Sequence, residues 1–322
     1  MRVKAGDQVT LVRELDNSLS VVPVAGSSPD SLSEVTATII PTEGSNTLKR
    51  KVVSMYLAGY NIIHLKLKSG RINPVLRDAV REVVRRNLVG TEMIADASDN
   101  ITLQVLLSLP ELSVNTAIRR MYLIASSMHK DAMSALSETN HELAKEVIKS
   151  DDEVDRFSLY ILRNLVMATQ NGRVLREMGL KNPSDCLSYR VAVKSIERVA
   201  DHACGIAERA IKLKDKIPKD SHQKIEKMSQ LALKVLEDSV EALLRRDYQL
   251  ADKTVDATEN VRVLENDAAA AIEKDKNHDP ANLKLVLEDI RRTAEYGSDI
   301  AEAAMNETID EVVEKHIAVH NK

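Results

Sequence analysis

The sequence predicts a mainly α-helical protein, in which a small α/β region is followed by tandem three-helix bundles with six long helices. From Leu112 onward the chain reads as helix, and Gly and Pro fall almost only at junctions such as Gly172, Pro218 and Pro280. This helical stretch contains the same unit twice. The chain has one Phe and no Trp, so its core must consist of Leu, Ile, Val, Met and Ala, which suits close helix packing.

The N-terminal third has short alternating elements instead. Residues 1–25 predict two strands, 8–12 and 18–22, joined by the turn Asp16-Asn17, and residues 26–34 form a polar linker. Residues 35–113 predict a small α/β domain. Its expected strands are 36–40, 61–67, 92–94 and 101–107, and its expected helices are 47–58 and 74–86.

Basic side chains gather on the two helices of this α/β domain. Acidic residues such as Asp78 and Glu82 are interleaved with them, which favours a solvated helix face over a binding patch. The basic residues are Lys49, Arg50, Lys51, Arg77, Arg81, Arg85 and Arg86.

The helical region is an internal duplication. With a shift of 107 residues, segment 128–147 aligns with 235–254 at five identical positions; with a shift of 94, segment 195–210 aligns with 289–304 at seven. The first copy, residues 114–213, predicts helices 114–138, 140–178 and 184–213. The second copy, residues 219–318, predicts helices 220–246, 248–275 and 280–315. Antiparallel helices joined by short turns make each copy a three-helix bundle.

The third helix of each copy carries a stripe of small residues at helical spacing. Gly297 lowers helix stability relative to Ala, so close contact with a neighbouring helix is its expected compensation. His202 and its counterpart Tyr296 are expected to pack within the bundle. The stripes are Ala200, Ala203 and Ala207 in copy one, and Ala294, Gly297 and Ala301 in copy two.

Composition narrows the class of protein. The 322 residues carry 45 basic and 49 acidic side chains, a net charge of −4, so we expect no overall attraction to nucleic acid. Cys186 and Cys204 are too few for a disulfide framework and are expected to be free thiols, with a single bridge as the alternative. No apolar run reaches the roughly 18 residues of a membrane span, and the start shows no signal peptide, so we expect a cytoplasmic protein.

Two acidic pairs in copy one have i,i+4 spacing: Asp151 with Asp155, and Glu197 with Asp201. Such pairs project from one helix face and repel each other unless a cation or an Arg intervenes. If the second and third helices pack antiparallel, the four carboxylates form a hard-oxygen metal site. The alternative is structural: residues 150–153 fit a helix capping box, and Arg198 or Arg209 neutralises the acids of the third helix.

Catalytic chemistry finds little support in the sequence. It contains no Gly-rich phosphate loop, no HExxH motif and no Cys/His metal spacing. His202 and Cys204 are two residues apart on one helix, so they point to different faces and do not form a nucleophile pair. We therefore expect a regulatory protein without an organic cofactor rather than an enzyme, and a metal-dependent hydrolase is the third-ranked hypothesis.

At these residues the chain resembles the PhoU family of phosphate-uptake regulators, in its archaeal type. Segment 196–208 (IERVADHACGIAE) is similar to the family's third-helix signature, segment 150–157 (SDDEVDRF) to its second-helix motif, and segment 290–302 to the second copy. The resemblance covers about 200 residues and implies the doubled three-helix fold. It also implies a negative regulator of phosphate uptake that contacts the phosphate ABC transporter or a signalling kinase.

The resemblance further implies multinuclear iron or zinc clusters held by E/D-x-x-x-D pairs. Carried over to this chain, the ligands are Asp151, Asp155, Glu197 and Asp201 of copy one. An Arg–carboxylate pair cross-links two helices without a cation, so we expect a metal in copy one only. The aligned positions of copy two, where two arginines replace two acids, are Thr258, Arg262, Arg291 and Glu295.

The front of the chain resembles a second family. Residues 4–24 are similar to the second half of an AbrB/SpoVT-type DNA-binding domain, whose remaining strands and helix would precede Met1. A DNA-binding transcriptional regulator is therefore the alternative function, although this segment retains only Arg2, Lys4 and Arg13 as basic residues. Two strands do not form a stable sheet alone, so we expect them to pair with strands of this chain or of a second copy, in a homo-oligomer.

Overall fold

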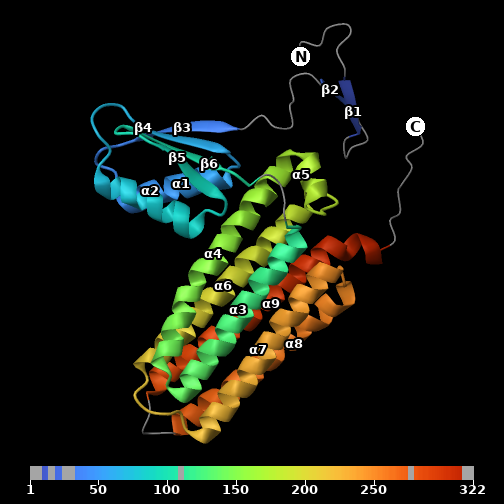
Figure 1. The fold of residues 1–322 in the computed structure, drawn as a ribbon. Coiled ribbons are helices and arrows are strands. Elements are labelled where there is room, and N and C mark those ends of the chain that lie inside the picture. Colours follow the sequence, from blue (N-terminus) through green and yellow to red (C-terminus); the bar gives the residue numbers. More distant parts are fainter. Residues whose placement is uncertain (1–8, 14–18, 24–32, 108–111, 275–278, 314–322) are drawn as a thin grey trace, which may run out of the picture.

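Two regions of different architecture follow one another in the computed structural model, which describes residues 9–13, 19–23, 33–107, 112–274 and 279–313 (Figure 1). A small α/β unit, residues 33–107, precedes a helical region that begins at residue 112. The expected fold class, mainly α with tandem three-helix bundles after an α/β region, is confirmed.

The α/β unit is a four-stranded mixed sheet with two helices on one face. Strands β3 (Glu34–Ile39) and β4 (Ile62–Leu67) are parallel, and helix α1 (Ser45–Leu57) supplies the crossover that parallel pairing requires. Helix α2 (Pro74–Asn87) connects β4 to β5 (Thr91–Asp96). Strand β6 (Asn100–Val105) pairs antiparallel with both β5 and β4, which gives the order β3-β4-β6-β5.

Apolar and polar side chains alternate along the strands, so one face of this sheet is buried and the other is exposed. Ile63 and Leu65 of β4 are fully buried against Leu48 and Tyr56 of α1, in a core separate from that of the helical region. The opposite face of the sheet is polar, and its exposed residues include Thr36, Thr38, Lys66 and Glu92.

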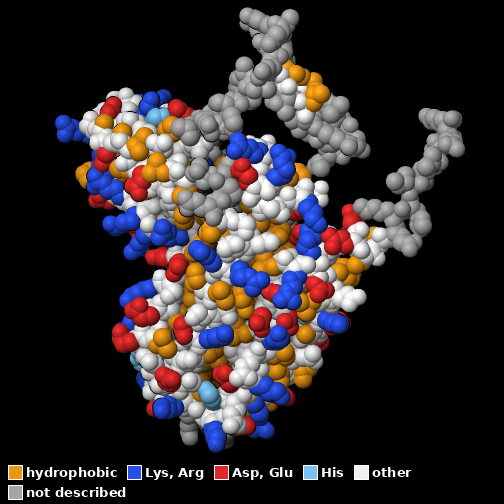
Figure 2. All heavy atoms as spheres, turned by 45° about the vertical axis from the view of Figure 1, so that its right-hand side comes forward, with side chains coloured by type: hydrophobic (Ala, Val, Ile, Leu, Met, Phe, Trp, Pro, Cys, Tyr) orange, Lys and Arg blue, Asp and Glu red, His pale blue; other side chains and the backbone are white. Residues whose placement is uncertain are grey.

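The basic residues of α1 and α2 are largely paired with acids. Arg81 contacts Asp78 at 3.2 Å, and Arg86 contacts Glu82 at 3.5 Å. Lys49 of α1 also reaches Glu82. This pairing agrees with the solvated helix face expected from the sequence, and Figure 2 shows charges of both signs intermixed over the surface.

The helical region contains both copies of the repeat. Copy one comprises α3 (Val114–Glu138), α4 (His141–Gln170), α5 (Gly172–Glu177) and α6 (Asp185–Lys212); copy two comprises α7 (Lys219–Arg245), α8 (Tyr248–Lys274) and α9 (Pro280–Val312). The single helix expected over 140–178 is wrong. Asn171 is extended (φ −140°, ψ 108°), and its side chain caps α5 by accepting a hydrogen bond from Arg173 N at 2.9 Å.

One continuous apolar core joins the two copies. Helix α6 packs against α3, α4 and α9, while α9 packs against α6, α7 and α8, so the two third helices lie at the centre (Figure 1). Ala200, Ala203 and Ala207 of α6 are fully buried, as are Ala294 and Ala301 of α9. These small side chains allow three neighbours to approach each central helix. Among the described helices, none combines the length and the apolar character of a membrane span.

At Gly297, helix α9 approaches α7 closely. A methyl group at this position would lie 3.1 Å from the backbone nitrogen of Leu236 and 3.0 Å from Val235 Cγ1. Both distances are shorter than the roughly 3.5–4.0 Å of an optimal non-bonded contact. The helix contact expected to compensate for this glycine is therefore confirmed.

Helix α4 holds the α/β unit against the helical region. Its Arg163 is 3% exposed and donates hydrogen bonds to the carbonyl oxygens of Tyr56 and Gly59 at the end of α1. The guanidinium carbon also lies 4.9 Å from the centre of the Tyr56 ring. Carbonyl groups at a helix C-terminus carry partial negative charge, so this buried cation is satisfied without a carboxylate.

A short hairpin lies near the N-terminus. Strands β1 (Val9–Arg13) and β2 (Leu19–Pro23) pair antiparallel, each one residue later than expected. Leu11 and Val21 are cross-strand partners and are 63% and 45% exposed. The expected turn Asp16-Asn17, the basic residues Arg2 and Lys4, and most of the expected linker lie outside the described residues.

Gly297→Ala tests the packing of α7 on α9. Alanine favours a helix interior by about 1 kcal/mol, but overpacking a tight contact costs about 1–3 kcal/mol, so we expect the free energy of unfolding to fall by about 1 kcal/mol. Urea denaturation followed by circular dichroism measures this change. Gly172→Ala is the matched control, because the nearest atom to a methyl group there is Nη1 of the exposed Arg176, at an ordinary contact distance of 3.6 Å. An equal effect of both substitutions would contradict the packing argument.

Candidate functional site

The acidic residues of copy one meet between α4 and α6, which pack side by side. The pKa of Asp151 on α4 is raised to about 6, first by burial and then by the charges of Asp155 and Asp201. The pKa of Asp155 is also raised, by burial and then by Asp201 on α6. Asp151, Asp155 and Asp201, three of the four predicted ligands, therefore lie near one another in a partly buried environment, where their negative charges repel.

Glu197, the fourth predicted ligand, forms an ion pair with Lys194 on the same helix. Burial and then the charge of Arg198 lower the pKa of Lys194, while Asp155 and Asp201 act in the opposite direction. The ammonium group is therefore the counter-charge of the acidic cluster. Lys194 was not predicted as part of this site, although its spacing of three residues from Glu197 and seven from Asp201 places all three on one helix face.

Asp151 has a carboxylate oxygen that is unpaired among the described residues. Asp151 Oδ1 is buried and accepts no hydrogen bond from the described part of the chain. Carboxylates on facing helices with an unsatisfied oxygen suit a hard cation. Over the described ranges, however, no three His, Cys, Asp or Glu side chains lie close enough together to hold a metal ion. The acids gather around Lys194 without the short separations of a formed metal site.

Both structural alternatives for these acids are wrong. Residues 150–153 lie inside α4, well after its start at His141, so they form no helix cap. Arg209 pairs instead with Asp289 of α9 at 3.4 Å. The guanidinium of Arg198 lies 5.6 Å from the centre of the Tyr296 ring.

In copy two, ion pairs between arginines and glutamates occupy the position that corresponds to the acidic cluster of copy one. Arg291 of α9 lies 3.3 Å from Glu265 of α8, and it also pairs with Glu295 on its own helix. Arg262 of α8 lies 4.0 Å from Glu295. The expected Arg–carboxylate cross-link between the helices of copy two is confirmed. The Thr258 hydroxyl donates a hydrogen bond to Thr254 O on its own helix.

His202 and Cys204 face different neighbours, as expected. His202 Nδ1 lies 2.8 Å from Asp289 Oδ1, and its ring lies 5.6 Å from that of Tyr296, which confirms their packing role. The Cys204 thiol donates instead toward the Val147 carbonyl of α4 at 3.9 Å. Burial and then nearby acids raise the pKa of this thiol to about 12, so it stays protonated and is no nucleophile. Cys186 and Cys204 are both free.

A buried carboxylate of α9 links the two copies. Asp289 is 6% exposed and contacts His202 and Arg209, both on α6. A methyl group at Gly205 would lie 2.9 Å from Asp289 Oδ2. Glycine in the interior of α6 is thus required by the carboxylate that packs against it.

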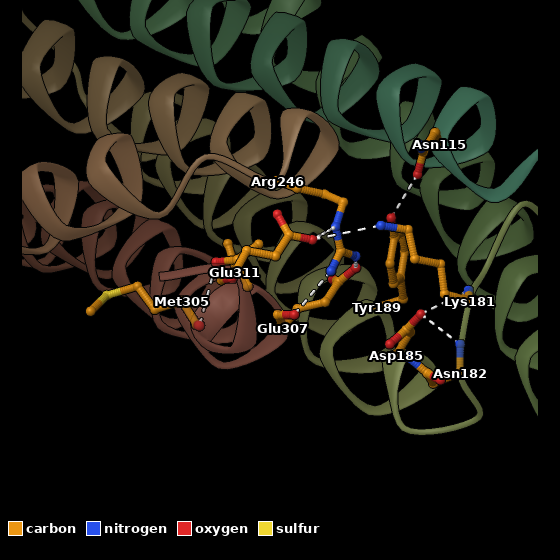
Figure 3. Close-up of polar contacts among 11 residues, drawn as sticks. Asn115, Lys181, Asn182, Asp185, Tyr189, Arg246, Met305, Glu307 and Glu311 are labelled. Carbon is orange, nitrogen blue, oxygen red and sulfur yellow. Dashed lines mark hydrogen bonds and ion pairs between the residues drawn. The ribbon is translucent and has the colours of Figure 1, made fainter. Parts of the chain in front are cut away.

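A second polar cluster, unforeseen from the sequence, lies at the opposite end of the α6–α9 contact (Figure 3). Arg246, just after α7, has a left-handed backbone (φ 58°), and its side chain pairs with Glu307 and with Glu311 of α9. The Glu307 side chain is 2% exposed. Burial raises the pKa of Glu307 to about 7; Arg246 opposes this rise, and Asp185 of α6 reinforces it. Residues of both copies therefore determine the charge state of this carboxyl.

Comparison with known proteins shows that the helical region matches one protein family. The PhoU domain family matches residues 118–210 and 225–304, one interval in each copy. The phosphate-specific transport system accessory protein PhoU homolog of Aquifex aeolicus is 30% identical over 175 residues, which cover 53% of this chain and 75% of that protein. PhoU homolog 1 of Thermotoga maritima is 27% identical over 141 residues, covering 42% of this chain and 56% of that protein.

Solved structures show the same fold. The crystal structure of PhoU from Pseudomonas aeruginosa has a TM-score of 0.55 and 19% identity, covering 61% of this chain and 96% of that one. The phosphate transport system regulatory protein PhoU from Streptococcus pneumoniae has a TM-score of 0.52 and 20% identity, covering 63% of this chain and 96% of that one. The family intervals lie within the helical region, so the α/β unit is outside the matched part.

Glu307→Gln tests the buried carboxyl. Because folding raises its pKa from 4.5 to about 7, the stability it contributes is complete below pH 4.5 and is lost as the pH rises through 7. We expect the free energy of unfolding to fall by about 2 kcal/mol more for the wild type than for the variant between about pH 5 and pH 8. Urea titrations across this range measure it. Glu311→Gln, the exposed partner of Arg246, is the control; identical pH slopes for Glu307→Gln and wild type would refute the assignment.

Proposed function

This chain belongs to the PhoU family, and from that premise we propose that it is a cytoplasmic, non-enzymatic negative regulator of phosphate uptake. The observation that carries the proposal is the match of both copies of the three-helix unit to that family. The relatives named above are called accessory proteins of phosphate-specific transport. Direct protein contact, with phosphate ABC transporter components or a signalling kinase, is the proposed mode of action.

The groove between α3 and α7 is the proposed contact surface. It has a volume of about 330 Å³ and lies where the first helices of the two copies adjoin. Leu123 is 58% exposed on its wall, and Arg119 bridges the groove to Glu241 at 3.1 Å. An apolar side chain flanked by charges of both signs is typical of a transient protein interface.

We also propose a metal site in copy one, with iron or zinc held by Asp151, Asp155, Glu197 and Asp201. A bound cation would neutralise these carboxylates and cross-link α4 to α6. The unsatisfied Asp151 Oδ1 and the mutual repulsion of the acids support the proposal. Lys194 forms an ion pair with Glu197, and this pair would have to break before Glu197 could bind the metal. Copy two has its arginine cross-link in the aligned place, so the proposal is limited to copy one.

Metal content tests this site. The purified protein is expected to bind iron or zinc, and the double variant Asp155→Ala plus Asp201→Ala is expected to lose it, because half of the donors are removed. Elemental analysis by mass spectrometry measures both. Glu265→Ala plus Glu295→Ala, the acids of copy two, is the matched control and should retain the metal. Unchanged metal content after the copy-one substitutions would sink the assignment.

A homo-oligomer formed through the β1–β2 hairpin is part of the proposal. Two strands alone are marginally stable, and Leu11 and Val21 expose apolar surface that a second hairpin would cover. The DNA-binding alternative gains no support from the named relatives, which are phosphate-transport proteins.

Phosphate uptake and co-purification test the regulatory role. We expect gene removal to raise uptake at high phosphate, and the tagged chain to recover transporter or kinase components at that phosphate level. Leu123→Glu should weaken this recovery, because it introduces a charge into the proposed groove. Leu187→Glu, a substitution at a residue 67% exposed on α6, is the matched control. Unchanged uptake without the gene, together with partners from neither system, would overturn the proposal.

A further inference from the structure

A cavity of about 320 Å³ lies where the α/β unit meets the helical region. Val89, between α2 and β5, and Leu107, after β6, come from the α/β unit. Leu112, before α3, and Phe157 of α4 come from the helical region, and Phe157 is the only phenylalanine in the chain. Small-molecule sites typically have volumes of about 300–1,000 Å³ and mostly apolar walls, so this cavity has the size and the lining of such a site.

Two arginines reach the cavity from neighbouring helices. Arg120 of α3 and Arg156 of α4 are exposed, and neither forms a hydrogen bond or an ion pair with a residue that the structure describes. Glu153 is the single acidic residue of the lining, so the cavity carries one positive charge in excess. Guanidinium groups bind phosphate, sulfonate and carboxylate groups through paired, charge-assisted hydrogen bonds.

The cavity adjoins the contact that holds the two regions together. The carbonyl oxygen of Val89, a lining residue, accepts a hydrogen bond from the Tyr56 hydroxyl at 3.3 Å. Arg163 of α4 also contacts Tyr56: its guanidinium group donates a hydrogen bond to the Tyr56 carbonyl oxygen and lies over the Tyr56 ring. A molecule in the cavity would therefore contact both sides of this junction.

We propose that the cavity binds an organic anion with an apolar body, and that this ligand fastens the α/β unit to the helical region. The apolar body lies against Leu107, Leu112 and Phe157, while Arg120 and Arg156 bind the anionic group. The family match begins at residue 118, so the cavity wall formed by the α/β unit lies outside the matched region. The proposal does not rest on a role in phosphate transport, because it concerns binding that is measured directly.

The test uses the full chain with two probes. The fluorescent aromatic sulfonate 8-anilinonaphthalene-1-sulfonate should bind at one site per chain, and phenyl phosphate should displace it. Phenol and inorganic phosphate at equal concentration should not, because each offers only one of the two required features. Phenyl phosphate should also raise the melting temperature of the wild type, since a ligand of the folded state stabilises it.

Arg120→Gln plus Arg156→Gln should weaken binding of both probes by roughly 10- to 100-fold, through loss of charge-assisted hydrogen bonds. The matched control is Arg190→Gln, an exposed arginine of α6 without an ion pair to any described residue; it should bind like the wild type. Circular dichroism verifies that each variant is folded.

Three results would overturn the proposal. One is equal probe affinity of the wild type and the double arginine variant. Another is displacement of the fluorescent probe by inorganic phosphate alone, which would indicate a site for the bare anion. The third is displacement of the fluorescent probe by phenol alone, which would indicate a site for the apolar body without the anion.

Discussion

Helices α6 and α9 are the elements on which the rest of the structure depends, because each has three helical neighbours and they contact one another at the centre. A core without tryptophan and with one phenylalanine cannot bridge wide gaps, so its helices must lie close together. Gly297 allows α7 to approach α9, and Gly205 leaves room for the Asp289 carboxylate. At one end of this contact His202 pairs with Asp289 and aligns α6 with α9; at the other end Arg246 pairs with Glu307 and joins the end of α7 to α9 within copy two.

The two copies share their architecture but stabilise the second and third helices by different electrostatics. In copy two, Arg291 and Glu265 satisfy each other across the helix pair. In copy one, the acids repel each other around a single ammonium group, and Asp151 keeps an unsatisfied oxygen. Uncompensated charge lowers stability, so a sequence retains it where a function requires it. This asymmetry is the physical reason why the proposed metal site is limited to copy one.

The α/β unit is packed separately from the helical region. It has its own core and contacts the helical region through a limited set of side chains, among them the buried Arg163. Because Arg163 bonds to carbonyl groups at the end of α1, the junction depends on the position of that helix rather than on an acidic partner. The neighbouring cavity, with Arg120 and Arg156 free of described partners, makes this junction a place where a small anion would influence both regions.

The sequence by itself determined the helical class, the duplication, the small-residue stripes and the replacement of acids by arginines, since helical periodicity and internal repeats are local patterns. It did not reveal that Lys194 pairs with Glu197, that Asn171 interrupts the long second helix, or that Arg246 and Glu307 meet. Arg246 meets Glu307, and Lys194 lies near Asp155 of α4, because of which helix faces pack together. Only the tertiary structure decides that choice, because burial, rather than sequence spacing, selects the partner of each charged side chain.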